Sequence, residues 1–141
     1  MQMPDVNVLI GAFRADSLLR ARCVPWFEAT LRNSSQLGLS PLILAAVIRV
    51  TTNHRTHSPP SRREDAIGFA NDLLALPNTV KLEPGPRHWT IFTKLLDTAD
   101  ILGPATTDAW FAALAIEHDC TFVTLDRDFS RFPGLKWTNP A

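Results

Sequence analysis

Three aspartates stand at turning points of the chain and could together bind a metal ion. Asp5 closes the first few residues, and Asp108 opens a long apolar run. Asp126 directly follows the apolar stretch 121–125. Carboxylate oxygens suit Mg²⁺ or Mn²⁺ better than nitrogen or sulfur ligands do. If the fold brings these acids together, they predict a site for a hard divalent cation.

Each of these acids also has an ordinary structural explanation. An Asp after a strand is commonly a turn residue, and an Asp at a helix start is commonly a cap. Asn7 lies two positions beyond Asp5 and could orient a carboxylate or a metal-bound water. Asp128 offers a second acid two positions beyond Asp126. Three such acids in one short chain favour a shared role.

The elements that must position these acids are short strands alternating with helices, which predicts an α/β fold with a mainly parallel sheet. Ligands of open parallel sheets bind at the carboxyl ends of the strands, so Asp5 and Asp126 are expected at one edge. Asp108 is expected in the first turn of a helix, where the dipole favours a negative charge. The expected strands are 1–4, 37–39, 80–82, 121–125 and an edge strand 135–137, and the expected helices are 6–13, 16–32, 41–50, 61–76, 86–99 and 108–116.

Local signals mark the starts of two helices. Ser40 and Pro41 begin one of them, with proline at a position where its missing N–H costs nothing. Ser61 and Glu64 have the spacing of a capping box and are expected to begin another. Glu117 lies nine residues beyond Asp108, about 180° around the helix, so we expect it to face away from the acids toward the surface or a partner.

Composition indicates a globular protein and gives no overall argument for a charged partner. The 141 residues suggest one domain, 1–141, with 14 basic and 14 acidic residues and a net charge of zero. The two cysteines, Cys23 and Cys120, form no metal-type pair and are expected to be reduced thiols of a cytosolic protein. The sequence contains neither a signal peptide pattern nor an apolar run long enough to span a membrane.

An ordered set of segments resembles one protein family along essentially the whole chain. The segments are Asp5-Val-Asn7-Val-Leu, Ser40 with the 42–50 helix, Thr107-Asp108-Ala, Thr124-Leu-Asp126-Arg-Asp128-Phe, and the ending 128–137. Together they resemble the PIN domain family, specifically the VapC toxins of type II toxin–antitoxin pairs. That resemblance implies a three-layer α/β/α fold with a short, mainly parallel central sheet.

The same resemblance implies an activity and a set of partners. The activity is Mg²⁺- or Mn²⁺-dependent endonucleolytic cleavage of structured RNA such as tRNA or rRNA. A cognate VapB antitoxin silences such a toxin by placing its tail in the active-site groove, and the toxin is typically a homodimer. These properties imply a cytoplasmic protein without membrane attachment.

Residue roles follow by carrying the family's site onto this sequence. Asp5 and Asp108 are expected to be the main metal ligands, and Asp126 is expected to complete the site directly or through water. Asp128 is a further candidate ligand, and Asn7 and Thr107 are expected to hold the carboxylates. RNA contacts are expected from the basic segment 49–63, which carries Arg49, Arg55, Arg62 and Arg63; a solvated loop facing VapB or water is the alternative.

One position departs from the family pattern. VapC-type domains usually carry a Glu six residues beyond the Ser that begins the third helix, and counting from Ser40 that position is Ala46. Ala46 could belong to a subgroup with a small residue there, or be a substitution that lowers toxicity. Either way the metal site lacks one carboxylate, which leaves a second hypothesis: a PIN-like module that binds RNA or antitoxin without catalysis.

A third class, an acidic-pocket phosphotransfer enzyme, fits the sequence poorly. A dehalogenase-like phosphatase needs a second Asp where Asn7 stands. A receiver domain needs a late Lys near the acids, and Lys136 follows a turn of the wrong kind.

Overall fold

Five short parallel strands form the centre of the molecule, in the order β3-β2-β1-β4-β5. The computed structural model describes residues 1–33 and 35–140. From β1, the chain adds β2 and then β3 on one side of the sheet. It then crosses back and adds β4 and β5 on the other side of β1. The expected α/β class with a parallel sheet is confirmed. The strands are β1 (Gln2–Pro4), β2 (Leu37–Leu39), β3 (Thr79–Lys81), β4 (Thr121–Val123) and β5 (Lys136–Thr138).

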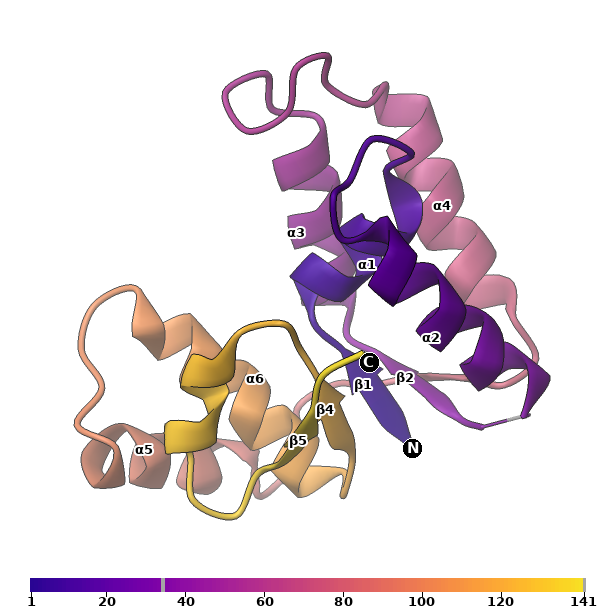
Figure 1. The fold of residues 1–141 in the computed structure, drawn as a ribbon. Coiled ribbons are helices and arrows are strands. Elements are labelled where there is room, and N and C mark those ends of the chain that lie inside the picture. Colours follow the sequence, from indigo (N-terminus) through magenta and orange to yellow (C-terminus); the bar gives the residue numbers. More distant parts are fainter. Residues whose placement is uncertain (34, 141) are drawn as a thin grey trace.

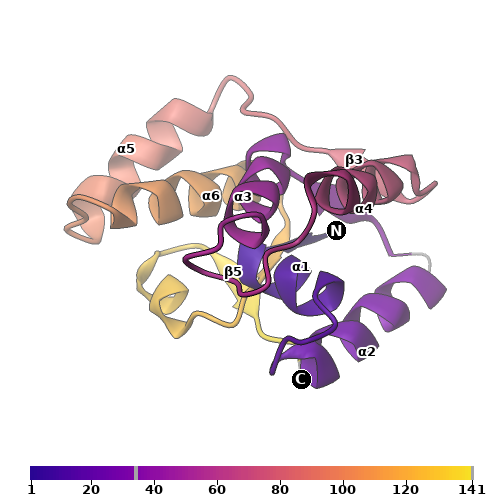
Figure 2. The ribbon, with the colours of Figure 1, turned by 90° about the horizontal axis from the view of Figure 1, so that it is seen from above.

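Helices cover the sheet on both sides. Figure 1 shows α1 to α4 gathered on one side of the strands and α5 and α6 on the other. Seen from above, α3 lies between α6 and α1 (Figure 2). None of the helices within the described residues is long and apolar enough to cross a membrane. The helices are α1 (Val6–Phe13), α2 (Arg20–Arg32), α3 (Pro41–Thr51), α4 (Arg63–Ala75), α5 (His88–Thr98), α6 (Ala105–Glu117) and the 3₁₀ helix η1 (Arg127–Arg131).

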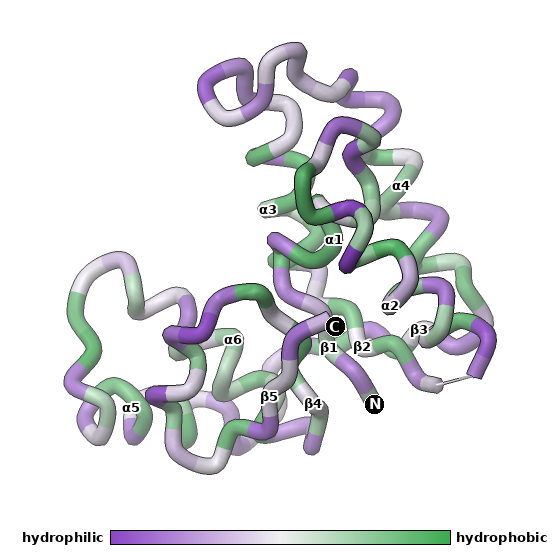
Figure 3. The backbone as a smooth tube through the Cα atoms, viewed as in Figure 1, coloured by the Kyte–Doolittle hydropathy of each residue, from purple (hydrophilic) through white to green (hydrophobic). Residues whose placement is uncertain are grey.

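The apolar core lies where the sheet meets α1, α3 and α6. Met3, Leu39 and Phe122 are fully or almost fully buried, as expected for strands covered on both faces. α6 buries most of its alanines, which lets it lie close to the sheet. The outer loops are mainly hydrophilic (Figure 3). Both cysteines are buried and free, as the sequence predicts.

The predicted start of α3 is confirmed, and the predicted starts of α4 and α2 are wrong. Ser40 accepts a hydrogen bond from the Leu42 backbone N–H and caps α3, with Pro41 at its first position. The predicted capping box at Ser61 is wrong, because α4 begins at Arg63 without a side-chain cap. Ser61 instead accepts a hydrogen bond from Arg14, so its hydroxyl serves a long-range contact. α2 begins at Arg20, later than expected, after the loop that leads from Arg14.

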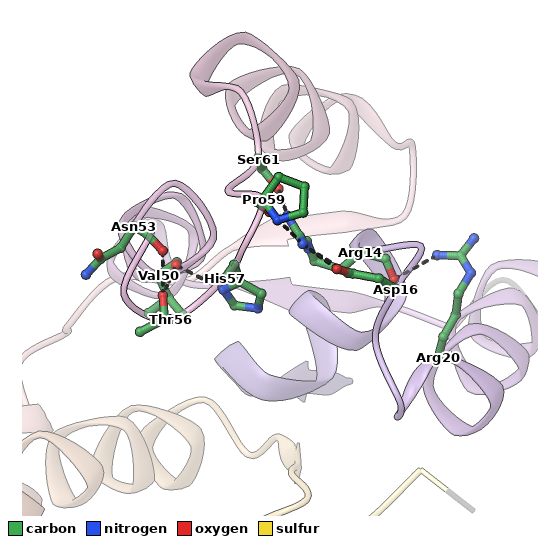
Figure 4. A network of polar contacts seen from close by, with 9 residues as sticks. All are labelled: Arg14, Asp16, Arg20, Val50, Asn53, Thr56, His57, Pro59 and Ser61. Atoms are coloured by element: carbon green, nitrogen blue, oxygen red, sulfur yellow. Dashed lines mark hydrogen bonds and ion pairs between the residues drawn. The ribbon is translucent and has the colours of Figure 1, made fainter.

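A buried arginine ties the end of α1 to the loop that follows α3 (Figure 4). The Arg14 side chain is 9% exposed and forms an ion pair with Asp16, Nη2 to Oδ2, at 2.6 Å. It also donates to the Pro59 carbonyl at 2.9 Å and to the Ser61 hydroxyl at 3.0 Å. In the same loop, His57 Nδ1 lies 3.2 Å from the Val50 carbonyl oxygen in the last turn of α3. The network holds α3 in place beside α1, the helix that follows Asp5.

Candidate active site

Asp5 is held at the junction of the two central strands. It directly follows β1, and its side chain caps α1 by accepting a hydrogen bond from Val6 N at 2.7 Å. Its own backbone N–H donates to the Val123 carbonyl at the end of β4, at 2.8 Å. The residue is 8% exposed. Asp5 is therefore a nearly buried carboxylate at the carboxyl edge of the sheet, where the strand order reverses and α/β proteins bind ligands.

Thr124 connects two of the predicted acids through one hydroxyl group. Thr124 Oγ1 donates to Asp5 Oδ2 at 2.7 Å and accepts from the backbone N–H of Asp126 at 3.0 Å. Pro4 pairs with Val123 in the sheet, so Asp5 and Thr124 are the next residues in line on adjacent parallel strands. Sequence reasoning missed this role; a hydroxyl residue directly after the strand that precedes Asp126 is the signal that could have indicated it.

The Asp126 side chain contacts the backbone that follows it and also lies near Asp5 and Asp108. Its Oδ1 accepts from the Asp128 N–H at 2.9 Å and so caps η1. The turn-residue explanation for Asp126 is therefore true, but it is not complete. Asp126 also lies close enough to Asp5 and Asp108 for its charge to raise the pKa of both groups. Asp128 is exposed, and its charge raises the pKa of Asp108.

A cleft of about 610 Å³ opens beside Asp5 and Asp108. It lies between the start of α1, the outer face of α3 and the first turns of α6, so Asp108 is in the helix turn that the sequence predicts. Ala46 lies in the wall, which places the residue at the family's usual Glu position beside the two acids. The lining residues are Asp5, Val6, Leu42, Ala45, Ala46, Arg49, Thr107, Asp108 and Phe111.

Arg131 is the second residue that sequence reasoning missed. Its Nη2 lies 3.3 Å from Asp108 Oδ2, and its guanidinium carbon lies 5.1 Å from the centre of the Phe132 ring. The contact joins η1 to α6. The sequence shows that Arg131 lies three positions after Asp128. Only the fold of η1 shows that Arg131 contacts Asp108 and not the acids closer to it in the sequence.

Burial and mutual repulsion both disfavour the charged forms of these acids. The pKa of Asp5 is raised to about 6, mainly by burial and also by the charges of Asp108 and Asp126, while the hydrogen bonds from Thr124 and Val6 lower it. Burial also raises the pKa of Asp108, while the Arg131 charge lowers it. A bound cation would favour the charged carboxylates, so this electrostatic environment fits a metal ion.

The donor set fits a hard divalent ion, although the side chains do not yet surround one. Both oxygens of Asp5 accept one hydrogen bond each, which leaves lone pairs for a further ligand. In residues 1–33 and 35–140, no three His, Cys, Asp or Glu side chains lie close enough to hold one ion. Asp108 is paired with Arg131, so binding a metal through Asp5 and Asp108 requires Asp108 to exchange this partner.

The residues expected to hold the carboxylates lie near the site but make other contacts. Asn7 Oδ1 accepts from the Leu125 backbone N–H at 3.4 Å and so links α1 to the segment after β4. Thr107 lines the cleft. Neither side chain forms a hydrogen bond with the three acids among the described residues. Asn7 therefore positions the loop that carries Asp126.

Glu117 faces away from the acids, but its expected surface or partner-facing role is wrong. Its carboxylate accepts hydrogen bonds from the Gly85 N–H at 2.7 Å and the Arg87 N–H at 2.9 Å. A Cβ on Gly85 would lie 2.7 Å from Glu117 Oε2, so the close approach requires glycine. Burial raises the pKa of Glu117, but the two backbone hydrogen bonds and the charges of His118 and His88 together lower it overall. Glu117 anchors the segment that enters α5.

The four arginines of the basic segment lie in different places. Arg49, on α3, lines the cleft beside Asp5 and Asp108. Arg62 forms an exposed ion pair with Glu64, Nε to Oε2, at 3.4 Å. Arg55 and Arg63 are exposed, the first in the loop after α3 and the second at the start of α4. Of these four described residues, Arg49 is the one that the fold brings to the acids.

Comparisons with known proteins agree with this geometry. The PIN domain family model matches residues 3–135. The chain is 39% identical over 140 residues to Ribonuclease VapC25 of Mycobacterium tuberculosis, covering 99% of each sequence. Its fold is similar to VapBC2 from Rickettsia felis bound to a promoter DNA fragment, with a TM-score of 0.72, 18% identity, and coverage of 98% of this chain and 97% of that one.

A second solved structure has a similar fold. M. tuberculosis VapC20, described as a sarcin–ricin loop cleaving toxin, has a TM-score of 0.71 and 12% identity, covering 96% of this chain and 98% of that one. The family match spans most of the chain, and the sequence identity to VapC25 extends over nearly its full length. The chain therefore belongs to the PIN domain family, within its VapC group.

Proposed function

We propose that this chain is a metal-dependent endoribonuclease toxin. The observation that carries the proposal is the position of Asp5 and Asp108, from the end of β1 and the first turns of α6, in one cleft, with Asp126 after β4 close enough for its charge to raise the pKa of both. VapC25 and other relatives at similar identity are named ribonucleases, which supports RNA as the substrate.

The metal would be held mainly by Asp5 and Asp108. Asp126 would complete the site directly or through water, with Asp128 as a further ligand. When bound, Mg²⁺ or Mn²⁺ would lower the pKa of a coordinated water and stabilise charge on the phosphate. Thr124 holds the Asp5 carboxylate in one orientation, and Asn7 fixes the backbone beside Asp126. Thr107, in the cleft wall, would orient the carboxylates through water.

The substrate we propose is a structured RNA such as tRNA or rRNA. VapC20, which has a similar fold, is described as cleaving the sarcin–ricin loop. Arg49, Arg55, Arg62 and Arg63 would bind phosphates on the side of the cleft formed by α3 and the loop after it, because neutralising phosphates releases counterions and favours binding. The zero net charge means that this local cluster, and not the whole surface, would attract RNA.

A VapB-type antitoxin is the proposed partner. VapBC2 of R. felis is a toxin–antitoxin complex, and its structure superposes on nearly all of this chain. An antitoxin tail placed in the cleft would cover Asp5 and Asp108 and so block the RNA. We further propose a homodimer acting in the cytoplasm, where its RNA substrates are found.

The proposal is tested by cleavage of a tRNA pool and of an rRNA fragment by the purified chain. Cleavage should require Mg²⁺ or Mn²⁺, stop with EDTA, and be lost in Asp5→Asn, because a neutral amide is a poorer ligand for a hard cation. A matched control is Asp119→Asn, at an exposed residue outside the cleft that binds Lys136. Cleavage that survives both EDTA and Asp5→Asn would contradict the proposal.

Ala46 favours a second candidate, a PIN-like module that binds RNA or antitoxin with little catalysis. Its methyl group lies in the cleft wall where a Glu would add a further carboxylate. Under this hypothesis, Ala46→Glu should tighten Mn²⁺ binding and create or increase cleavage. If neither changes, Ala46 is not the position of a missing ligand, and the second candidate loses its support.

A further inference from the structure

We propose that Arg49 is the residue that binds a substrate phosphate inside the cleft. In this chain α3 then contributes a positively charged guanidinium group to the site and not a fourth carboxylate. The proposal rests on the proposed ribonuclease function and assigns one residue of its substrate site. It separates Arg49 from Arg55, Arg62 and Arg63, which do not line the cleft.

One face of α3 forms a wall of the cleft. Leu42, Ala45, Ala46 and Arg49 all line the cleft, and they follow the i, i+3, i+4, i+7 pattern of one helix face. The two alanines are small, so they leave open space between the Arg49 side chain and the acids. The cleft volume of about 610 Å³ can hold a phosphate group together with a hydrated ion, since Mg²⁺ keeps several of its waters.

Arg49 has no ion-pair partner in the part of the chain that the structure describes. Among residues 1–33 and 35–140 it forms no ion pair, unlike Arg14 and Arg131, which bind Asp16 and Asp108. It lies in the last turn of α3, where the negative end of the helix dipole stabilises a positive charge. Its guanidinium remains available for a ligand, and its planar donors suit the two oxygens of a phosphate.

The charge of Arg49 also balances the negative charges of the cleft. Asp5 and Asp108 would repel a phosphodiester, and the proposed metal would offset part of that repulsion. Arg49, on the α3 wall, offsets more of it without competing for the carboxylates, since it forms no ion pair with either acid among the described residues. A cation near the metal also opposes metal binding, so Arg49 should favour RNA and disfavour the ion. These opposite effects distinguish the role from a purely structural one.

The test uses a fluorescein-labelled RNA hairpin and the Asp5→Asn background, in which RNA can be bound without being cut. Adding Arg49→Gln should weaken hairpin binding about tenfold, a change of about 1.4 kcal/mol. It should also reduce the slope of log affinity against log salt concentration by about 0.7 to 0.9, the value of one lost phosphate contact. Arg49→Lys should keep the salt slope while losing part of the affinity, because lysine lacks the planar donors.

A matched control is Arg32→Gln, which removes an exposed arginine on α2 that pairs with Glu28 and does not line the cleft. It should change hairpin binding less than twofold. In the chain with Asp5 intact, Arg49→Gln should bind Mn²⁺ at least as tightly as the parent, which also shows that the variant is folded.

Unchanged hairpin affinity and salt slope in Arg49→Gln would overturn the proposal, as would an equal loss in Arg32→Gln. Weaker Mn²⁺ binding in Arg49→Gln would also overturn it, by showing that Arg49 supports the acids. These results are distinguishable from failure of the ribonuclease proposal, which depends on whether the chain with Arg49 intact needs a metal and Asp5 to cleave RNA.

Discussion

The hydroxyl of Thr124 donates to Asp5 Oδ2 at 2.7 Å, although the two residues are 119 positions apart. The same oxygen accepts from Asp126 N–H. The parallel pairing of β1 and β4 therefore fixes the positions of two acids before any metal binds. The burial of both Asp5 and Thr124 makes this hydrogen bond strong, since water does not compete for it.

Removing this hydroxyl should weaken both the fold and the binding of a metal ion. Thr124→Val keeps the shape of the side chain but removes the donor to Asp5 and the acceptor for Asp126 N–H. We expect the free energy of unfolding to fall by about 1–3 kcal/mol. Metal affinity should fall about 10- to 100-fold, because the carboxylate loses the group that orients it. Urea unfolding and Mn²⁺ titration calorimetry measure the two effects.

Thr138→Val is a matched control on the neighbouring strand. Thr138 is exposed, and its hydroxyl bonds only the carbonyl of the next residue, at 3.4 Å, among the described contacts. We expect no change in Mn²⁺ affinity from this variant. Equal Mn²⁺ affinities of the parent and Thr124→Val would contradict the orienting role of Thr124.

The metal-free protein should lose stability as pH rises from about 4 to about 6. The pKa of Asp5 is raised from 3.8 to about 6, so in this window the folded state binds more protons than the unfolded state. The protonated Asp5 side chain therefore stabilises the fold fully below the pKa that Asp5 has in the unfolded chain. This contribution is lost above the pKa that it has in the folded protein. Two pKa units correspond to about 3 kcal/mol, so Asp5→Asn should gain about 2–3 kcal/mol relative to the parent between pH 4 and pH 7.

Urea unfolding with EDTA present measures this difference. Asp119→Asn provides a control of opposite sign, since the hydrogen bond from Lys136 lowers the pKa of Asp119 and its stabilisation is lost as pH falls through that value. If the parent and Asp5→Asn changed in parallel with pH, Asp5 would not carry the raised pKa.

Glu117 should matter for stability and not for RNA cleavage. Glu117→Ala leaves the Gly85 and Arg87 N–H groups without their acceptor, so we expect a loss of about 1–3 kcal/mol. Glu83→Ala is the control, because the Glu83 carboxylate forms an exposed ion pair with Lys81 at 4.0 Å, worth less than about 1 kcal/mol. Differential scanning calorimetry gives the stabilities. A loss of cleavage in Glu117→Ala molecules that remain folded would indicate a catalytic role instead.

Arg14 should be more important for stability than the neighbouring exposed arginine. Arg14→Met fills a similar space but removes the donors to Asp16, Pro59 and Ser61, and we expect a loss of about 1–3 kcal/mol. Arg20→Met removes an exposed hydrogen bond to the Ala12 carbonyl and should cost less than about 1 kcal/mol. Thermal unfolding distinguishes them, and equal melting temperatures would show that the buried network contributes no net stability.

The sequence predicts the fold and the edge of the sheet where the acids lie because these depend on local patterns. Apolar runs that end in Asp5 and Asp126 determine strands whose carboxyl ends face the same way. Asp108 in the first turn of α6 follows from the apolar run behind it. Expected element boundaries differ from the observed ones by one residue at β3 and β5, by two residues at the end of β4, and by three or more residues at the starts of α6 and α2.

Contacts between distant segments could not be predicted, because they depend on tertiary geometry. Thr124 reaches Asp5 only because β1 and β4 are neighbours in the sheet. Arg131 pairs with Asp108 because η1 folds back over α6, and no pattern in the sequence marks that 3₁₀ helix. Ser61 has the spacing of a helix cap, yet it binds Arg14 from the other side of the loop. In each case the contact is determined by a residue that is distant in the sequence.

The most direct test of the account is a crystal structure with Mn²⁺, using the anomalous signal to locate the ion. We predict a peak in the cleft within about 2.5 Å of oxygens from both Asp5 and Asp108, with the Asp108 carboxylate released from Arg131. The peak should disappear in Asp5→Asn. A structure with Mn²⁺ only at exposed acids such as Asp119, and with Asp108 still paired to Arg131, would contradict a metal site in this cleft.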